Sequence, residues 1–341
     1  MSYQVTFQPS GHVISAEADE SLLESAIQAG LMVPYGCRDG ACGACKATLN
    51  SGEVLLDQFS PTALTPQDVA AGMTLLCRAH PTSDLVLTVR NVQRAGDIPI
   101  KKLPCRVQRL ERLAPDVMRL EVKLPATEQF RFLAGQYVDF LIAGGKRRSF
   151  SIANAPEGAT TLEFHVRLIE GGEFTGHVFG GMKEKEILRF EGPLGSFFLR
   201  EDSDAPIVLL AGGTGFAPIK GLVEHAIEAG ISRPMTLYWG ARNRAGLYLA
   251  DLADSWSHAL PRFKFVPVLS DSTEEDAWSG RTGLVHQAVM ADLPDLSGSH
   301  VYACGAPPMI DAARQEFTTR CGLAEDAFFA DAFTYSTDSA A

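Results

Sequence analysis

Four of the seven cysteines in this chain follow a spacing that strongly constrains what its first part can fold into. They form the pattern C-x4-C-x2-C followed by one distant cysteine: Cys37, Cys42, Cys45 and Cys77. Four thiolates at this spacing are typical ligands of a [2Fe–2S] cluster, and the small residues between them let backbone N–H groups approach the sulfurs. A zinc site of four cysteines is the alternative, although structural zinc sites more often pair two C-x2-C knuckles, and only one is present here.

The chain divides into blocks by the rhythm of its apolar residues. Residues 1–92 combine short alternating strands with one capped helix and the cysteine-rich loop, which predicts a small iron–sulfur domain. Residues 93–102 are polar, contain Gly and Pro, and are predicted to be a linker. Residues 103–200 contain short strand-like runs separated by turn residues, which predicts an antiparallel β-barrel.

In the last block, residues 205–341, strands alternate with helices, which predicts an α/β domain with a parallel sheet. Four apolar strands are expected, over 207–210, 235–239, 263–268 and 300–304. The first of these runs into Gly212, Gly213, Thr214 and Gly215. A glycine turn that opens a helix lets the backbone approach the pyrophosphate of a dinucleotide, although such turns are also common without a ligand.

Composition and charge narrow the classes of function. Apolar residues make up 46% of the chain and charged residues 21%, which is typical of a soluble globular protein. A net charge of −11 argues against nucleic-acid binding, which is driven by basic patches. There is no evident signal peptide and no apolar run near the roughly 20 residues of a membrane-spanning helix, so we expect a cytoplasmic protein without disulfides.

The cysteine loop and the barrel block resemble known families. Residues 35–45 (YGCRDGACGAC) and 76–78 (LCR) resemble plant-type ferredoxins, which implies a β-grasp fold and a [2Fe–2S] cluster held by the four cysteines. Residues 147–151 (RRSFS) resemble the Arg-x-Tyr-Ser motif of the ferredoxin–NADP reductase family. Over its whole length the chain is similar to the ferredoxin-first reductases of that superfamily, in the branch with CDP-6-deoxy-Δ3,4-glucoseen reductase and the oxygenase reductase components.

This resemblance implies roles for residues of the second block. Arg148 would pair with a flavin phosphate, Phe150 would stack on the isoalloxazine ring in place of the usual Tyr, and Ser151 would hydrogen-bond near the flavin N5. The second flavin-binding segment of the family matches four further residues: His165, Arg167, Gly172 and Thr175. Taken alone, the first motif is a weak indication of flavin binding, and a solvated arginine pair beside a core Phe is the alternative.

The resemblance also implies nicotinamide-binding residues in the last block. They are the glycine loop Gly212, Gly213, Thr214 and Gly215 together with Arg242, Cys304 and Gly305. Phe333 resembles the family's C-terminal aromatic residue, which can lie near the flavin. Ser151, Cys304 and Phe333 are thus the expected catalytic group, with packing in a core as the alternative for Cys304 and Phe333.

These parts form a complete path for electrons. Nicotinamide gives two electrons as a hydride, a flavin releases them singly, and a [2Fe–2S] cluster accepts one. By resemblance the flavin is FAD and the donor NADH, with NADPH as the alternative because Arg242 and Arg244 follow the second strand of the nucleotide domain. We therefore expect an NADH-dependent iron–sulfur flavoprotein reductase.

A separate protein is the expected electron acceptor. The resemblance favours a pyridoxamine-dependent sugar dehydrase, with a component of a multicomponent oxygenase as the alternative. Two other functions stay open: a reductase of free flavin, and a redox-sensing binding module without enzymatic activity. Residues 1–92 contain nine Asp or Glu against four Lys or Arg, so a basic patch on the partner would favour encounter.

Overall fold

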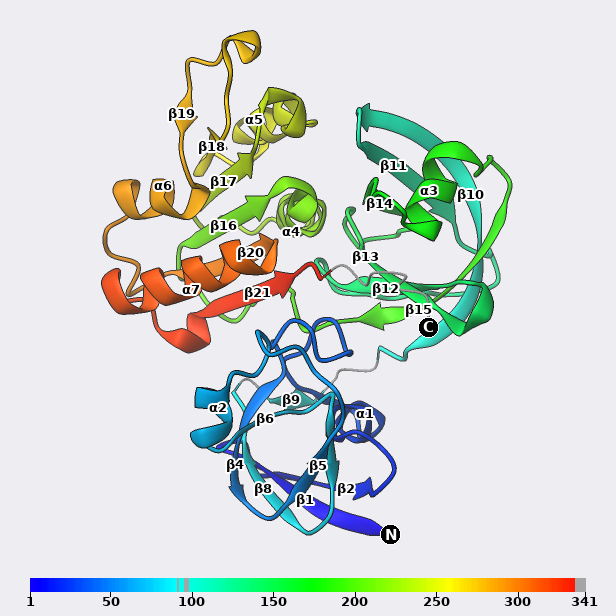
Figure 1. Cartoon of the computed structure of the whole chain (residues 1–341). Helices are drawn as coiled ribbons and strands as arrows, with labels where there is room; N and C mark the ends of the chain where they lie inside the picture. The colour runs from blue at the N-terminus through cyan, green and yellow to red at the C-terminus, as the bar shows by residue number, and fades with distance from the viewer. Residues whose placement is uncertain (91, 95–97, 335–341) are drawn as a thin grey trace. The chain divides into compact units, whose positions relative to one another are not determined.

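A computed structural model of the chain describes residues 1–90, 92–94 and 98–334. Two compact units emerge (Figure 1). The first contains Met1–Ile98 together with Asp331–Thr334, and the second contains Pro99–Ala330. The predicted linker, residues 93–102, falls partly outside the described residues; its described part includes strand β9 (Gln93–Arg94) and the start of β10 (Lys101–Ala114).

The first unit is built on a mixed five-stranded sheet of the predicted β-grasp type. Its strands follow the order β2 (His12–Glu17), β1 (Ser2–Gln8), β8 (Leu85–Thr88), β4 (Lys46–Ser51) and β6 (Met73–Leu75). Strand β1 pairs antiparallel with β2 and parallel with β8. Helix α1 (Leu22–Gln28) begins where the Ser21 side chain accepts the N–H of Glu24, and it buries Leu22, Leu23 and Ala26.

Shorter elements complete this unit around the cysteine loop. They are β3 (Leu31–Met32), which pairs with β9, the pair β5 (Val54–Leu56) and β7 (Ala79–Pro81), and helix α2 (Pro66–Ala70). Thr65 caps α2 in a capping box with Asp68, and Asp68 in turn pairs with Lys46 at 2.8 Å. This pair ties α2 to β4, the strand that follows the third cysteine of the loop.

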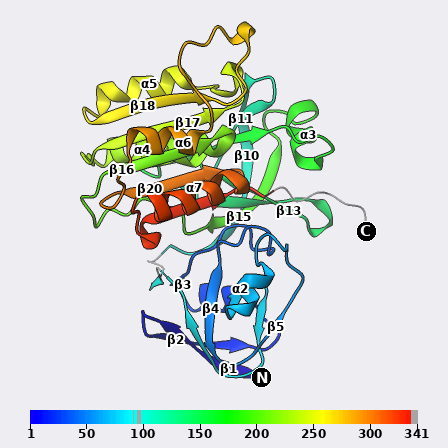
Figure 2. The same ribbon diagram turned by 60° about the vertical axis from the view of Figure 1, so that its left-hand side comes forward.

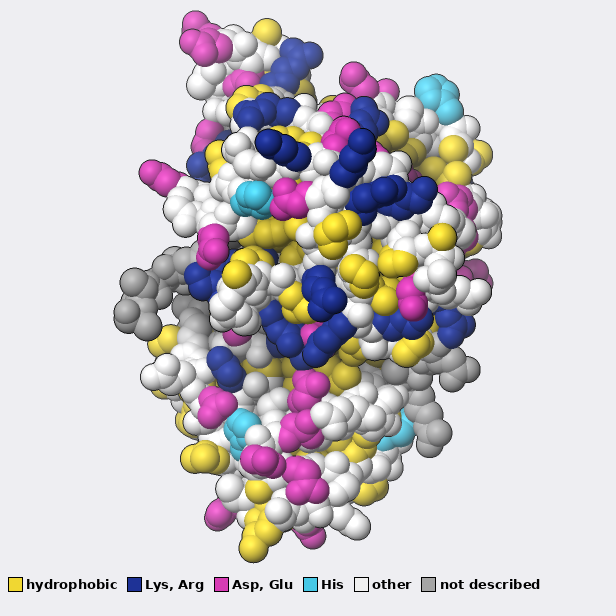
Figure 3. All heavy atoms as spheres, turned by 90° about the vertical axis from the view of Figure 1, so that its right-hand side faces the viewer, with side chains coloured by type: hydrophobic (Ala, Val, Ile, Leu, Met, Phe, Trp, Pro, Cys, Tyr) yellow, Lys and Arg dark blue, Asp and Glu magenta, His cyan; other side chains and the backbone are white. Residues whose placement is uncertain are grey.

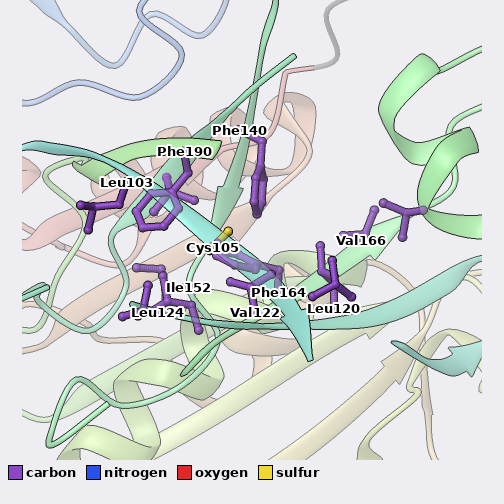
Figure 4. Close-up of a cluster of buried hydrophobic side chains, with 14 of the residues drawn as sticks. Leu103, Cys105, Leu120, Val122, Leu124, Phe140, Ile152, Phe164, Val166 and Phe190 are labelled. Atoms are coloured by element: carbon purple, nitrogen blue, oxygen red, sulfur yellow. The ribbon is translucent and has the colours of Figure 1, made fainter. Parts of the chain in front are cut away.

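The second unit begins with the predicted antiparallel barrel. Its strands follow the order β13 (Arg147–Ser151), β12 (Tyr137–Leu141), β15 (Ile187–Leu194), β10, β11 (Val117–Lys123) and β14 (Thr161–Arg167). Figure 4 shows the apolar core of this barrel, in which Phe140, Phe164 and Phe190 are at most 1% exposed. Burying a side chain of this size contributes about 2 kcal/mol, so alternation along these strands fixes which face turns inward.

The rest of the second unit is the predicted α/β domain. Its strands follow the order β19 (Arg281–Thr282), β18 (Phe263–Leu269), β17 (Met235–Ala241), β16 (Ile207–Gly212), β20 (His300–Gly305) and β21 (Phe328–Ala332). From β19 to β20 all neighbours are parallel. The four predicted strands are confirmed, each within two residues of its expected bounds.

Helices cover both faces of this parallel sheet (Figures 1 and 2). Helices α4 (Phe216–Glu228) and α5 (Ala250–Ala259) lie on one face, and α6 (Val285–Asp292) and α7 (Pro307–Arg320) on the other. The direction of winding reverses between β16 and β20, and ligands bind open α/β sheets in the crevice at such a reversal. Among the described helices, none is long and apolar enough to cross a membrane.

Candidate functional site

The four cysteines lie together in the first unit as two close pairs. The Sγ atoms of Cys45 and Cys77 are 3.3 Å apart, while the backbone N–H groups of Cys37 and Cys42 each donate to the other's sulfur, at 3.4 and 3.3 Å. Two thiol pairs suit a cluster in which each of two irons takes two protein ligands. This pairing fits the [2Fe–2S] cluster that the cysteine spacing predicts.

Backbone N–H groups approach the sulfurs as the small residues of this loop predict. Ala41 donates to Cys37 Sγ at 3.3 Å, and Ala44 donates to Cys42 Sγ at 3.4 Å. Hydrogen bonds from the Cys37 thiol and from backbone N–H groups, against the effect of burial, lower the pKa of the Cys42 thiol to about 7. A lowered pKa at this thiol favours the thiolate form, which is the form that binds iron.

Glycine and an ion pair hold the loop in this shape. Gly43 adopts a φ of +72°, and a Cβ atom there would lie 2.9 Å from the carbonyl oxygen of Ala63. Arg38 adopts a φ of 64°, unusual for a residue with a side chain, and its guanidinium bonds to Glu24 on α1 at 2.8 Å. Glu24 is a residue that the cysteine pattern did not reveal, because its contribution depends on how α1 packs beside the loop.

The first predicted flavin motif lies on β13, beside helix α3 (Glu173–Gly180). Arg148 and Phe150 share one face of the strand, since they pair across β12 with core residues Phe140 and Val138. The Phe150 ring lies 5.3 Å from the Phe174 ring on α3. This contact brings the two predicted flavin-binding segments together, and it leaves Phe150 half-buried against the barrel core.

Gly172 is the N-cap of helix α3 and makes no side-chain cap hydrogen bond to the first N–H groups of the helix. A Cβ atom at Gly172 would lie 2.6 Å from the Thr175 hydroxyl oxygen. That hydroxyl accepts the N–H of Ile169 at 3.2 Å and bonds back within its own turn. In this arrangement Thr175 shapes the turn, and a helix start without a side-chain cap suits an anionic ligand.

The two predicted residues on β14 face the nicotinamide domain. Arg167 Nη2 is 3.2 Å from the position of a Cβ on Gly213, and its Nε is buried without a hydrogen-bond partner among the described residues. A buried donor of this kind fits a phosphate or a ring acceptor. His165 is fully enclosed, and both of its ring nitrogens bond to protein groups, Glu163 and Tyr248. Any contact of His165 with a flavin would therefore come from its backbone.

The glycine loop after β16 packs directly against the end of β20. A Cβ atom at Gly215 would lie 2.1 Å from the carbonyl oxygen of Cys304, and one at Gly212 would lie 2.7 Å from Met309 Sδ. Gly305 has a φ of 152° and lies against the backbone of Gly212. These glycines form a cradle that any side chain would fill, which fits a dinucleotide backbone at the reversal of the sheet.

Aromatic side chains support the same loop from β17. The Trp239 ring stacks on Phe216 with centroids 3.8 Å apart, and its indole N–H donates to the carbonyl of Gly213 at 2.9 Å. Trp239 was not among the predicted site residues. Its position could be inferred only from the parallel register of β16 and β17, which sets Trp239 opposite Ala211.

A cavity of about 400 Å³ opens at the carboxyl ends of β17 and β18, lined in part by Arg244, Tyr248, Asp251 and Trp278. Predicted Arg242 is exposed nearby, and its carbonyl accepts the N–H of Asp271. Arg244 bonds to Asp276 through its backbone N–H at 2.8 Å. No acidic residue follows β17 directly in the sequence, and the structure supplies Asp251 and Asp276 from later elements.

Phe333 is the last of the predicted site residues along the chain. It follows β21 and belongs to the short segment Asp331–Thr334, which groups with the first unit. Its predicted place near a flavin stays a prediction.

Three domain families match successive parts of the chain. The 2Fe-2S iron-sulfur cluster binding domain matches residues 5–82, the oxidoreductase FAD-binding domain 104–199 and the oxidoreductase NAD-binding domain 209–315. The chain belongs to the ferredoxin-first reductases of the ferredoxin–NADP reductase superfamily. It is an NAD(P)H-dependent oxidoreductase whose cofactors are a [2Fe–2S] cluster, FAD and NAD(H), and its partner is an electron-acceptor protein.

Individual relatives span nearly the whole chain. CDP-6-deoxy-L-threo-D-glycero-4-hexulose-3-dehydrase reductase of Yersinia pestis is 44% identical, covering 98% of this chain and all of the relative. The reductase component of phenol 2-monooxygenase from Pseudomonas sp. is 36% identical, covering 92% of this chain and 89% of the relative. The crystal structure of an Amycolatopsis cytochrome P450 reductase has a TM-score of 0.80 at 32% identity, covering 98% of this chain and 99% of that one.

Proposed function

We propose that this chain supplies electrons from NADH to a dehydrase that acts on a nucleotide-linked hexulose. The observation that carries the proposal is the 44% identity, over the full length of both chains, to a reductase named for such a dehydrase. Five relatives that are reductase components of oxygenases are less similar, at 32–36% identity. The three domains would carry electrons in the same order to a dehydrase or to an oxygenase.

Within the second unit, Arg148, Phe150 and the start of α3 would hold FAD, and the Gly212–Gly215 loop with Gly305 would hold the dinucleotide. Bound FAD accepts a hydride and releases electrons singly. The chain's own residues supply the rest: glycines admit the ligand backbone, and the buried Arg167 Nε offers a donor. Ser151 and Cys304 are both buried, which suits groups that position a reacting ring and exclude water.

NADH is the proposed donor. The Asp251 carboxylate at the cavity can accept hydrogen bonds from ribose hydroxyls, as acidic residues do in NAD-binding domains. Arg244 is a cation there that would suit a 2′-phosphate, and the Asp276 carboxylate lies beside it, because it accepts the Arg244 backbone N–H at 2.8 Å. A carboxylate beside that site repels an added phosphate. Comparing kcat/KM for the two donors tests this, and a preference of about tenfold for NADPH would contradict it.

The acceptor is tested by single-turnover electron transfer. The purified protein is reduced anaerobically with NADH and mixed with a purified hexulose dehydrase or with an oxygenase component, and cluster reoxidation is followed by absorbance and EPR. We expect fast reoxidation by the dehydrase in the presence of its sugar nucleotide and slow reoxidation by the oxygenase. The reverse order would instead identify the chain as an oxygenase reductase.

Two further alternatives have their own tests. A free-flavin reductase would release its flavin as a substrate, whereas we expect FAD to co-purify with the protein. A redox-sensing module would not be reduced by NADH, whereas we expect NADH to bleach the flavin absorbance without oxygen. Incubation with NADH and a sugar nucleotide alone should give no product, because the proposed function requires a separate dehydrase.

A further inference from the structure

A buried network of hydrogen-bonded polar side chains connects the barrel to the nicotinamide domain inside the second unit. His165 Nε2 lies 2.8 Å from Glu163 Oε1 on the same strand, β14, and His165 Nδ1 lies 2.9 Å from the Tyr248 hydroxyl. Tyr248 stands between the short helix η3 (Arg244–Gly246) and α5 in the nicotinamide domain. Lys220 on α4 completes the network, at 3.2 Å from Glu163 Oε2.

The protonation states of these side chains determine which group donates in each hydrogen bond. Against the effect of burial, the His165 hydrogen bond and the charges of Lys220 and Arg119 lower the pKa of Glu163 to about 2, so Glu163 only accepts. Burial lowers the pKa of His165, which is therefore neutral at pH 7. Its Nε2–H then donates to Glu163, and its Nδ1 accepts the hydrogen bond from Tyr248. Burial also raises the pKa of Tyr248, which keeps its hydroxyl proton.

The Tyr248 ring contacts residues on the nucleotide-binding side of the nicotinamide domain. The ring lies edge-on to Trp239 at 5.1 Å and 86°, and Trp239 donates to Gly213 in the glycine loop. The same Tyr248 side chain lines the cavity at the ends of β17 and β18. One residue thus contacts the barrel strand, the tryptophan that holds the glycine loop, and the cavity wall.

Holding the two domains together does not depend on the Tyr248 hydroxyl. Lys220 binds the Ala153 carbonyl at 3.1 Å, Glu163 at 3.2 Å and Glu224 at 2.8 Å, so it anchors α4 to the barrel by itself. Removing the Tyr248 hydroxyl leaves these contacts intact. What it removes is the hydrogen bond between the Tyr248 hydroxyl and His165 on β14.

We propose that Tyr248 is a positioning residue for hydride transfer, because its hydrogen bond to His165 fixes the nicotinamide loop and the cavity wall against the flavin-binding strand. The inference rests on the proposed passage of hydride from NADH to FAD. Small displacements of reacting atoms cost large factors in rate, so the hydroxyl should affect the transfer step more than binding.

The test compares Tyr248→Phe with Tyr238→Phe in the full-length holoprotein. Tyr238 is the matched control, because it is buried on β17 and its hydroxyl donates to Asp292, at 3.1 Å, within the same domain. Flavin reduction at saturating NADH is followed by anaerobic stopped flow, together with the isotope effect of NADH deuterated at the transferred position. We expect Tyr248→Phe to slow reduction about tenfold with a larger isotope effect and a nearly unchanged dissociation constant for NADH, and Tyr238→Phe to reduce at the wild-type rate.

A second readout does not depend on turnover. In hydrogen–deuterium exchange, amides of residues 213–216 should exchange faster in Tyr248→Phe and in His165→Gln than in Tyr238→Phe. Equal reduction rates and equal exchange in Tyr248→Phe and Tyr238→Phe would overturn the inference while leaving the proposed function intact. Failure of NADH to reduce the wild-type flavin would instead overturn the proposed function itself.

Discussion

Gly215 illustrates how much a single residue decides at the nicotinamide loop. Its φ is ordinary for any residue, so the requirement for glycine there comes from contact and not from backbone strain. The position of its missing Cβ lies 2.1 Å from the carbonyl oxygen of Cys304, which is backbone and cannot turn aside. The loop and β20 would have to separate to admit a methyl group.

Gly215→Ala should therefore impair use of the nicotinamide donor without affecting the cluster. We expect kcat/KM for NADH to fall roughly 5- to 150-fold, since overpacking by one methyl group costs roughly 1–3 kcal/mol. Gly298→Ala is the matched control, because that glycine in the same domain has open space around its Cβ position. Wild-type kcat/KM in Gly215→Ala would show that the loop does not approach the ligand as described.

Cys77 carries the corresponding prediction for the iron–sulfur site. Cys77→Ser leaves Cys45, its neighbour at 3.3 Å, without a second thiolate for one iron. The visible absorbance and EPR signal of the cluster should be lost, FAD should stay bound, and NADH–ferricyanide activity should survive. Retention of a full [2Fe–2S] spectrum would refute the ligand assignment. Cys105→Ser, at a buried barrel thiol outside the loop, should leave the spectrum unchanged.

Some individual site residues could be predicted from sequence and others could not. The predicted cluster ligands follow from spacing, because three thiolates in one loop and a fourth in the turn between β6 and β7 have few other uses. Asp251 and Asp276 could not be found in this way, since they reach the Arg244 neighbourhood from α5 and from a later loop. Their contribution depends on how distant segments pack, which a local pattern does not encode.

Strand β14 is the element on which the second unit depends most. Its alternation buries Leu162, Phe164 and Val166 in the barrel core and turns Glu163 and His165 toward the nicotinamide domain. Strand β14 therefore has two structural roles. Its inward face is apolar and packs in the barrel core, and its outward face carries a buried network of charged and polar groups. This explains why a neutral imidazole is enclosed there.

The enclosed imidazole predicts a specific pH dependence of stability. An unfolded chain protonates His165 below its ordinary pKa of 6.5, whereas the folded protein, with Glu163, Tyr248, Lys220 and Arg119 around the ring, resists protonation to lower pH. Stability from this group is thus present above pH 6.5 and is lost as pH falls below it. Glu163 does not titrate in this range, because its pKa is about 2.

His165→Gln checks this sign. The free energy of unfolding of wild type and variant is measured by denaturant titration between about pH 8 and about pH 5. Wild type should be more stable at the upper end, and the difference should narrow as pH falls. Because the other histidines are common to both proteins, their contributions cancel. A difference that widens on acidification would mean that His165 is protonated in the folded protein.

Elements with a clear apolar period could be predicted, whereas elements without one are harder to predict. The parallel strands are continuous apolar runs between glycine turns, so their bounds agree with expectation. Strand β15 has a weak signature in sequence, because Gly192 and Pro193 interrupt its end. Helix α5 buries only Ala253 and Trp256, so its packing against the sheet also has little signature in sequence.

Across the whole molecule, charge is distributed unevenly among the domains. Residues 1–92 carry nine acidic against four basic side chains, while residues 103–200 carry twelve acidic against fourteen basic. Figure 3 shows Asp and Glu side chains gathered on the visible face of the first unit and Lys and Arg side chains over the barrel. An acidic iron–sulfur domain favours encounter with a basic surface on the acceptor.

Electron transfer to the acceptor should therefore slow as ionic strength rises, because salt screens charges beyond about 8 Å near physiological strength. Turnover with ferricyanide should change less. Asp39→Asn, at an exposed position of the cysteine loop, should weaken the salt dependence, since its amide oxygen can still accept the Ala41 N–H. Glu275→Gln, exposed in the nicotinamide domain, is the control. Transfer that is independent of salt would exclude electrostatic steering of the partner.

The cavity beside Tyr248 has a consequence for how the protein can be observed. Trp278 lines that cavity and is half-buried, whereas Trp239 is enclosed and stacked on Phe216. A purine ring entering the cavity would quench the emission of Trp278 and leave that of Trp239 largely unaltered. The protein thus contains its own optical reporter of nucleotide occupancy, which can be read with an oxidised, non-reacting nucleotide and without any change in the state of the flavin or the cluster.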